Sequence, residues 1–434
     1  MKVLISTWGN PRGWGEVEYL YKDKCEKAKD PSRLIKNKEN IDKTIIISVD
    51  TLADESIPSS DDRKYEKIKK SAEEIIRDFY WHEFKEEPNK IIISYGVGEF
   101  NKSKFIGNAM DFYFSILKEL SFTLLEWLEE DKSNRRLEIY LDISHGMNFV
   151  PVLTYRALKE ILQIFAYIFE TKFVVLNSDT FIRSEKPLFL NINEIENGKI
   201  IPKITIYQSD KKMIEPYTNL KNEEKKEMAK KLLEDFSIDD KILCFLSSFM
   251  YGMPVLVINY IPNIENLKTK IEKTIKKFEE EIKIEINFPS KWVIKRNLEF
   301  RINFENLVKA YLVSWLLRRC DISQKTEVEI EEIQEIKKKI WKSNFPAESN
   351  RIDVEIKDIK KIKSISSNWK PYYEILGNQG SNINERNFFA HAGFEHNTIE
   401  IKKDDDKIKI RIYKDNEEEI KNYLKKNLPR SEYA

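Results

Sequence analysis

The sequence predicts an α/β N-terminal half followed by a mainly α-helical C-terminal half. Up to about residue 205, short β-branched runs alternate with amphipathic stretches of helical length, which is typical of a mostly parallel sheet with helices on both faces. Several runs are apolar on consecutive residues, as expected for strands buried on both faces. Beyond residue 208, lysine- and glutamate-rich helical segments replace this alternation. We expect a sheet domain at 1–205, a helical connector at 206–290 that could contain a helix-turn-helix, and a helical domain with a small β-hairpin at 291–434.

The N-terminal half supplies the elements of the expected sheet. The expected strands are 2–6, 44–49, 91–95, 139–144 and 173–178. The expected helices are 61–85, with Ser60 or Asp61 as its cap, 103–130, with Ser103 as its cap, and 148–169. We expect 188–193 and 200–207, separated by Glu-Asn-Gly, to form a closing hairpin.

The C-terminal half contains longer helical patterns. We expect helices at 221–236, 263–284, 300–320 and 415–427, and a hairpin of 397–403 and 407–414 joined by three aspartates. The segment 242–261 is uncharged over about the length that spans a bilayer. However, Gly252-Met253-Pro254 interrupts it, so two short buried helices, or a helix and an extended piece, explain it better than a membrane span.

Composition limits the classes of function. With 74 Lys+Arg against 73 Asp+Glu, the formal net charge is +1. No global positive field attracts nucleic acid, so a site for RNA or phosphate has to be local. The three cysteines are far apart and have no zinc spacing, as expected for reduced thiols in a cytoplasmic protein: Cys25, Cys244 and Cys320.

The loops that follow three expected strands are rich in glycine and polar residues. They read STWGNPRGWGE from Ser6, SYGVGEFNKS from Ser94, and SHGMNF from Ser144. Ligands of open parallel sheets bind beyond the carboxyl ends of the strands. Glycines there let a ligand approach the backbone, and a helix that begins after SHGMN favours an anion, so these loops suit a phosphate-bearing ligand. A dinucleotide cofactor fits poorly, because Gly96-Val97-Gly98 lacks the third glycine of the usual fingerprint.

Three of these segments resemble a known sensor family. LDISHGMNFVPVLTYRAL (141–158), the opening VLISTWGNPRGW and IISYGVGEF resemble the CARF domain of CRISPR-associated accessory ribonucleases. The resemblance implies a Rossmann-like domain that dimerises and binds cyclic oligoadenylate across the two-fold axis. It places ligand contacts on Ser6, Trp8, Gly9, Asn10, Tyr95, Gly96, Gly98, Ser144, His145, Gly146 and Asn148. Many such domains carry Lys or Arg where Met147 and Asn148 stand here, so amides, hydroxyls or the cations Arg12, Lys102 or Lys104 would meet the phosphates.

Residues 385–397, ERNFFAHAGFEHN, contain two of the four histidines of the chain. In RNFFAH, polar Asn387 follows Arg386, apolar residues could anchor a helix, and Ala392-Gly393 after His391 marks a helix end. This resembles the R-[NDH]-x-x-x-H signature of HEPN ribonucleases, helical domains that dimerise through the motif. The resemblance implies catalytic roles for Arg386, Asn387 and His391.

The chemistry of these side chains agrees with the resemblance. Five helical residues turn the chain by about 500°, which leaves Arg386 and His391 about 140° apart, so two copies facing across a two-fold axis are needed for a compact site. A histidine base can help a 2′-hydroxyl attack the adjacent phosphorus, and an arginine can stabilise the phosphate charge, without metal. Products with 2′,3′-cyclic phosphate and 5′-hydroxyl ends would follow. The other histidines, His82 and His396, are expected to be structural or peripheral.

We therefore expect a metal-independent endoribonuclease for single-stranded RNA in type III CRISPR antiviral defence. The expected activator is a cyclic oligoadenylate, with cyclic tetra-adenylate favoured over hexa-adenylate, and no cofactor or membrane is involved. The expected assembly is a cytoplasmic homodimer or a higher homo-oligomer of dimers. The alternative is a ligand-gated, non-catalytic nucleic-acid-binding regulator with the same sensor. A metabolic enzyme would need catalytic acids or a complete cofactor fingerprint at the strand ends, and neither is found.

Overall fold

The N-terminal half forms an eight-stranded sheet with helices on both faces, as predicted. The structure is a computed structural model that describes residues 1–55, 64–180, 189–232, 236–287 and 291–430. The strand order is β3-β2-β10-β9-β8-β1-β4-β5. Its centre is parallel and comprises β9 (Glu170–Ser178), β8 (Arg136–Asp142), β1 (Lys2–Thr7), β4 (Lys43–Val49) and β5 (Lys90–Ser94). Consecutive residues of β1 and β4 are buried, which explains their uninterrupted apolar runs.

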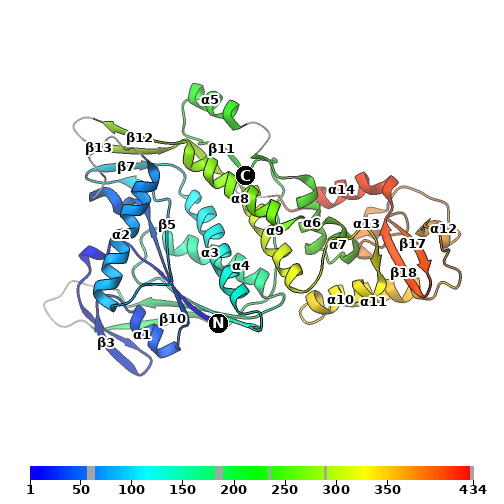
Figure 1. The fold of residues 1–434 in the computed structure, drawn as a ribbon, viewed down its shortest axis with the longest axis horizontal. Helices are drawn as coiled ribbons and strands as arrows, with labels where there is room; N and C mark the ends of the chain where they lie inside the picture. Colours follow the sequence, from blue (N-terminus) through cyan, green and yellow to red (C-terminus); the bar gives the residue numbers. More distant parts are fainter. Residues whose placement is uncertain (56–63, 181–188, 233–235, 288–290, 431–434) are drawn as a thin grey trace.

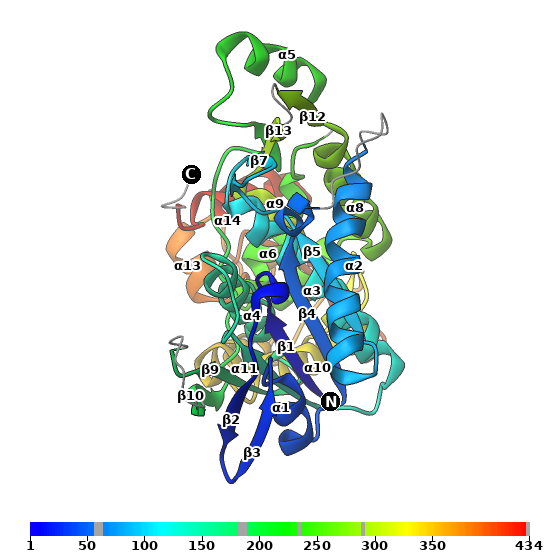
Figure 2. The same ribbon diagram turned by 90° about the vertical axis from the view of Figure 1, so that its left-hand side faces the viewer.

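The helices that connect these strands lie on opposite faces of the sheet. α2 (Tyr65–Phe84) and α3 (Met110–Glu130) lie on either side of β5 in Figure 1. α1 (Ser32–Glu39) and α4 (Val150–Phe165) each contact β1. The hairpin of β2 (Val17–Tyr21) and β3 (Lys24–Ala28), which the sequence analysis missed, extends one end of the sheet (Figure 2).

Two local predictions in this half are wrong. Ser103 does not cap a helix, because Ser103–Ile106 form β7, which pairs with the distant β13 (Lys291–Arg296), and α3 begins only at Met110. The expected hairpin is one strand, β10 (Phe189–Lys199), which runs through Glu-Asn-Gly antiparallel to β9, and no strand forms at 200–207. The expected caps Ser60 and Asp61 lie outside the described residues.

The uncharged segment 242–261 folds as two short helices, as expected. α6 (Asp240–Met250) and α7 (Pro254–Tyr260) are separated at Gly252, which has a φ of +65°. Both helices are largely buried. Among the described residues, no helix is long and apolar enough to cross a membrane.

The helices expected at 221–236, 263–284, 300–320 and 415–427 form as α5 (Asn222–Leu232), α8 (Ile264–Glu280), α9 (Ile302–Arg319) and α14 (Glu417–Lys426), and the motif lies on α13 (Glu385–Ala390). Three further helices were not predicted: α10 (Ile330–Ile336), α11 (Pro346–Lys360) and α12 (Tyr372–Ile375). The late hairpin is confirmed as β17 (Ile399–Asp404) and β18 (Lys407–Ile412). The expected helix 263–284 ends earlier, because β12 (Ile282–Asn287) pairs with β13.

Helix α9 joins the two halves. It packs on α3 and α4 of the sheet domain and on α6 and α8, and lies centrally in Figure 1. Its fully buried Lys309 pairs with Glu305 and with Glu160 of α4, both at 2.6 Å. The paired strands β12 and β13 lie on either side of the expected boundary between the connector (206–290) and the last domain (291–434). The domain boundaries stay predictions.

Candidate active site and ligand-binding pocket

The motif residues stand on a short, firmly anchored helix. In α13, the side chain of Asn384 caps the N-terminus by accepting a hydrogen bond from the backbone N–H of Asn387 at 3.0 Å. Phe388 is fully buried and fixes the helix on the domain. The helix ends at His391, where the N–H of Gly393 donates to the carbonyl of Phe388 at 2.9 Å, with a φ of +81° at Gly393. The predicted helix end is therefore confirmed.

The three motif side chains are exposed, although the helix that carries them is anchored on the domain. Arg386, Asn387 and His391 are each exposed. Within the described residues, the Arg386 guanidinium has no hydrogen bond or ion pair. The His391 ring donates from Nδ1 to Oε1 of Glu355 at 2.7 Å, and 47% of the His391 side chain is exposed. A neutral ring in this arrangement leaves Nε2 as a free acceptor.

Helix α11 positions the motif through two charged residues that the sequence analysis missed. Glu355 holds His391, and one turn earlier Arg351 donates to the carbonyls of Phe389 at 2.9 Å and Tyr251 at 2.7 Å. Burial lowers the pKa of Arg351. Glu355 is buried with Ile352, Ile356 and Ile359 on one face of α11. In the sequence, an acidic residue within the apolar stripe of a helix could have identified Glu355.

A pocket of about 330 Å³ lies at the carboxyl ends of β8 and β9. Ser144 and His145, which the sequence predicted as ligand contacts, line it. The Trp14 ring stacks on His145 with a centroid distance of 4.0 Å, and the Tyr19 hydroxyl is hydrogen-bonded to Nε2 of His145 at 2.9 Å. Burial lowers the pKa of His145 and so favours a neutral ring, although the charge of Asp142 acts in the opposite direction. The pocket thus offers aromatic rings and uncharged polar groups, together with one carboxylate, Asp179, which accepts hydrogen bonds from the side-chain amides of Asn191 and Asn193.

Other predicted ligand residues shape the loops around this pocket. The N–H of Gly9 donates to the carbonyl of His145 at 2.9 Å. A Cβ at Gly146 would lie 2.1 Å from Cγ of Pro151, so this position has room only for glycine. Asn148 and Asn10 are exposed, and Asn148 has a φ of +51°.

The remaining predicted ligand residues do not line this pocket. Ser6 and Trp8 are buried, Ser6 against Ser32 at 3.0 Å between hydroxyl oxygens. The residues after β5 meet elements from beyond residue 270 instead: the Tyr95 hydroxyl donates to Glu279 at 3.0 Å, and the Gly96 carbonyl accepts from the buried Arg296 at 2.6 Å. Gly98 lies in the short strand β6 (Gly98–Glu99), next to β7. Ligand contacts at these residues stay a prediction.

Several residues that line the pocket were not chosen from the sequence. They include Gly13, Trp14, Tyr19, Asn177 and Thr180. Asn177 is the penultimate residue of the expected strand 173–178, so its place at the carboxyl edge of the sheet could have identified it. The place of Tyr19 in the pocket could not be predicted from the sequence, because Tyr19 lies in the β2–β3 hairpin, which was not expected.

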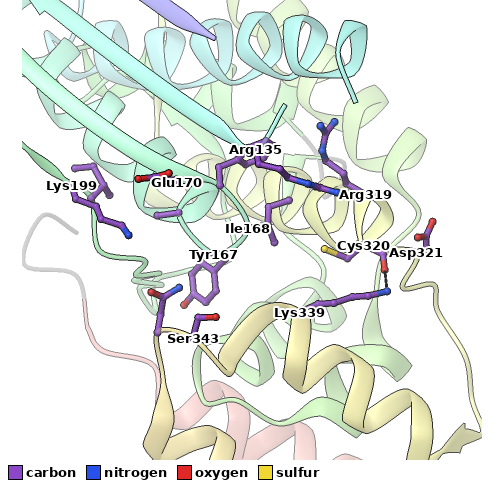
Figure 3. Close-up of a pocket in the computed structure, with 14 residues that line it drawn as sticks. Arg135, Tyr167, Ile168, Glu170, Lys199, Arg319, Cys320, Asp321, Lys339 and Ser343 are labelled. Carbon is purple, nitrogen blue, oxygen red and sulfur yellow. Dashed lines mark hydrogen bonds between the residues drawn. The ribbon is translucent and has the colours of Figure 1, made fainter. Parts of the chain in front are cut away.

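A second pocket, of about 440 Å³, lies where the sheet domain meets the end of α9 (Figure 3). Four cationic side chains line it, with two acids: Arg135, Lys199, Arg319, Lys339, Glu170 and Asp321. Arg319 donates to the carbonyl of Leu128 at 2.8 Å, and burial together with Arg135 lowers its pKa. None of the predicted site residues lies here, and the described residues contain no group of three or more His, Cys, Asp or Glu arranged to hold a metal ion.

Comparisons with known proteins agree with both resemblances. Residues 3–180 match the family described as CRISPR system endoribonuclease Csx1, CARF domain, and residues 345–427 match CRISPR system endoribonuclease Csx1, HEPN domain. A relative described as CRISPR system endoribonuclease Csx1, from Methanocaldococcus jannaschii, is 31% identical over 423 residues, covering 92% of this chain and 86% of that protein. The first match contains every residue that lines the pocket at His145 except Leu190, and the second contains α11 and the motif helix. The chain therefore belongs to the Csx1 family of CRISPR system endoribonucleases.

Proposed function

We propose that this chain is a cyclic-oligoadenylate-activated, metal-independent endoribonuclease that cleaves single-stranded RNA in type III CRISPR defence. The observation that carries the proposal is His391, whose ring Glu355 holds through Nδ1 at the C-terminal end of the short helix that also presents an exposed Arg386. Family membership supports an endoribonuclease over the non-catalytic regulator, because the relative is described as an endoribonuclease.

The motif side chains have distinct roles in the proposed reaction. Nε2 of His391 accepts the proton of a ribose 2′-hydroxyl, whose oxygen then attacks the adjacent phosphorus. Arg386 stabilises the negative charge on the phosphate oxygens, and Asn387 orients the RNA. The P–O5′ bond breaks, and the leaving oxygen takes up a proton. The products carry a 2′,3′-cyclic phosphate and a 5′-hydroxyl.

The proposed active unit is a homodimer. One α13 is only six residues long and presents a single Arg386 and a single His391, both exposed. Two copies facing across a two-fold axis supply a second histidine, which can protonate the leaving oxygen, and a second arginine. Both the exposure of the motif and its short supporting helix favour this arrangement.

The proposed activator occupies the pocket at His145. About 330 Å³ accommodates part of a cyclic oligoadenylate, and the same pocket of a second copy would take the rest of the ring. The Trp14 ring, which stacks on His145, can contact a base, and the side-chain amide of Asn177 offers hydrogen bonds. We favour cyclic tetra-adenylate, which divides evenly between two pockets, and place the protein in the cytoplasm, where the effector complex would make the activator.

Analysis of the cleavage products tests this proposal. Single-stranded RNA is incubated with the protein and cyclic tetra-adenylate in EDTA, and the product ends are identified by mass spectrometry. We expect 2′,3′-cyclic phosphate ends in EDTA. Products with 5′-phosphate ends, or activity that EDTA abolishes, would contradict the proposed chemistry.

A further inference from the structure

A third pocket, of about 580 Å³, adjoins the motif helix at Asn387. We propose that this pocket binds a nucleobase next to the scissile phosphate and that the loop 378–382 sets the base preference of cleavage. The inference rests on the proposed function and adds the source of its sequence specificity.

Unpaired amides dominate the wall of this pocket. Four side-chain amides that line it have no hydrogen-bond partner within the described parts of the chain: Asn378, Gln379, Asn382 and Asn387. Each amide presents both an N–H donor and a carbonyl acceptor. The edges of nucleobases also combine donors with acceptors, and in single-stranded RNA these edges are free to bind protein.

Two ring side chains in the wall can also contact a base. Tyr373 and His396 line the pocket, and the backbone N–H of Tyr373 donates to the carbonyl of His396 at 3.0 Å, which fixes the two residues side by side. Ring side chains stack on the bases of single-stranded RNA. The pocket therefore offers a base both ring contacts and unpaired amides.

The charge of the pocket favours an uncharged group over a phosphate. No lysine or arginine is among the described residues that line it. Its one carboxylate, Glu395, is buried and already accepts hydrogen bonds from the backbone N–H of Asn397 at 2.7 Å and from its side-chain amide at 3.1 Å. Arg386 precedes Asn387 on α13 and is available for the phosphate. The motif helix thus presents a cation to the backbone of RNA and an amide to a base.

The amide loop is held in place before RNA binds. The N–H of Ser381 donates to the side-chain oxygen of Asn397 at 3.0 Å, and the N–H of Asn378 donates to the carbonyl of Tyr373 at 2.9 Å. Gly380 lies against the Tyr373 ring, where a Cβ would be 2.9 Å from Cζ. A preorganised loop lets the amides discriminate between bases at little ordering cost.

The test measures base preference separately from activity. The native protein, Asn378→Ala, Asn382→Ala and the double variant cleave a randomised single-stranded RNA with cyclic tetra-adenylate, and the cut sites are sequenced. Well-placed hydrogen bonds discriminate by about 1–3 kcal/mol, or roughly 5- to 150-fold. We expect the native protein to show such a preference at one position flanking the cut, and the double variant to cleave with a preference below about threefold. Asn368→Ala, an exposed amide outside the pocket, is the matched control and should keep the native preference.

Each result separates this inference from the proposed function. A native protein without base preference, or variants that keep it, would overturn the inference while leaving cleavage intact. Light scattering is run on the same variants: a change in oligomeric state with unchanged preference would show that the loop contacts a second copy, which also overturns it. Cleavage that survives in His391→Ala would instead refute the proposed function.

Discussion

The substitution Glu355→Gln tests whether His391 acts as a base whose ring is held by α11. Gln has nearly the same shape as Glu but is neutral, so the hydrogen bond to Nδ1 loses its charged acceptor. The amide can also turn its NH₂ group towards Nδ1, which favours the ring form with the proton on Nε2, the atom that has to accept it. Both effects reduce the fraction of His391 that is ready to act, while the RNA-binding side chains stay in place.

The size of the effect follows from the hydrogen bond. At 2.7 Å between Nδ1 and Oε1, it is a short contact to a buried carboxylate. Hydrogen bonds to charged groups contribute about 1.5–3 kcal/mol, and about 1.4 kcal/mol corresponds to a tenfold change in rate. We therefore expect the single-turnover cleavage rate of Glu355→Gln to fall about 10- to 150-fold, with unchanged RNA affinity.

The assay combines rapid-quench cleavage of labelled RNA with a binding titration. Asp358→Asn is the matched control, because Asp358 lies on the same helix and pairs with Lys361 at 2.7 Å, away from His391. It should cleave at the native rate. The reasoning is refuted if Glu355→Gln retains the native rate, or if its loss is entirely in RNA affinity.

Three further predictions concern the sensor, the motif support and stability. Gly146→Ala should weaken cyclic tetra-adenylate binding at least about tenfold in calorimetry, because its Cβ would meet Pro151 at 2.1 Å, whereas Gly198→Ala, with open space around its Cβ, should bind normally. Arg351→Ala should lower the free energy of unfolding in urea by about 3 kcal/mol, because two hydrogen bonds to carbonyls are lost; an unchanged transition would contradict this. Burial raises the pKa of Asp111 from 3.8 to about 8, so folding favours its protonated form. Protonated Asp111 therefore contributes to the free energy of unfolding at acidic pH, and this contribution is lost as the pH rises towards the pKa of Asp111 in the folded protein. The unfolding free energy of the native protein relative to Asp111→Asn should therefore fall by about 3 kcal/mol between about pH 5 and pH 8, and a constant difference would be the contrary result.

The features that the sequence predicted well depend on local patterns. The alternation of apolar strands and amphipathic helices, the break at Gly252-Met253-Pro254 and the helix end after His391 each follow from residues close together in the chain. The motif helix and the loop at His145 were accessible for the same reason, since each is a short contiguous segment.

The features that were missed depend on contacts between distant segments. The stretch at Ser103 forms a strand because its partner, β13, begins 188 residues later with Lys291. Glu355 becomes part of the site only when α11 packs beneath α13, 36 residues further along the chain. Likewise, Tyr19 reaches His145 across 126 residues. Periodicity and motif spacing carry no information about such pairings.

The central claim is that activator binding at the N-terminal pocket turns on RNA cleavage at His391. The most direct measurement is cleavage of a labelled single-stranded RNA in EDTA, with and without cyclic tetra-adenylate, for the native protein and for His391→Ala. The account predicts that the activator raises native cleavage and that His391→Ala is inactive although it still binds the activator. Activator binding without any native cleavage, or cleavage that persists in His391→Ala, would contradict it.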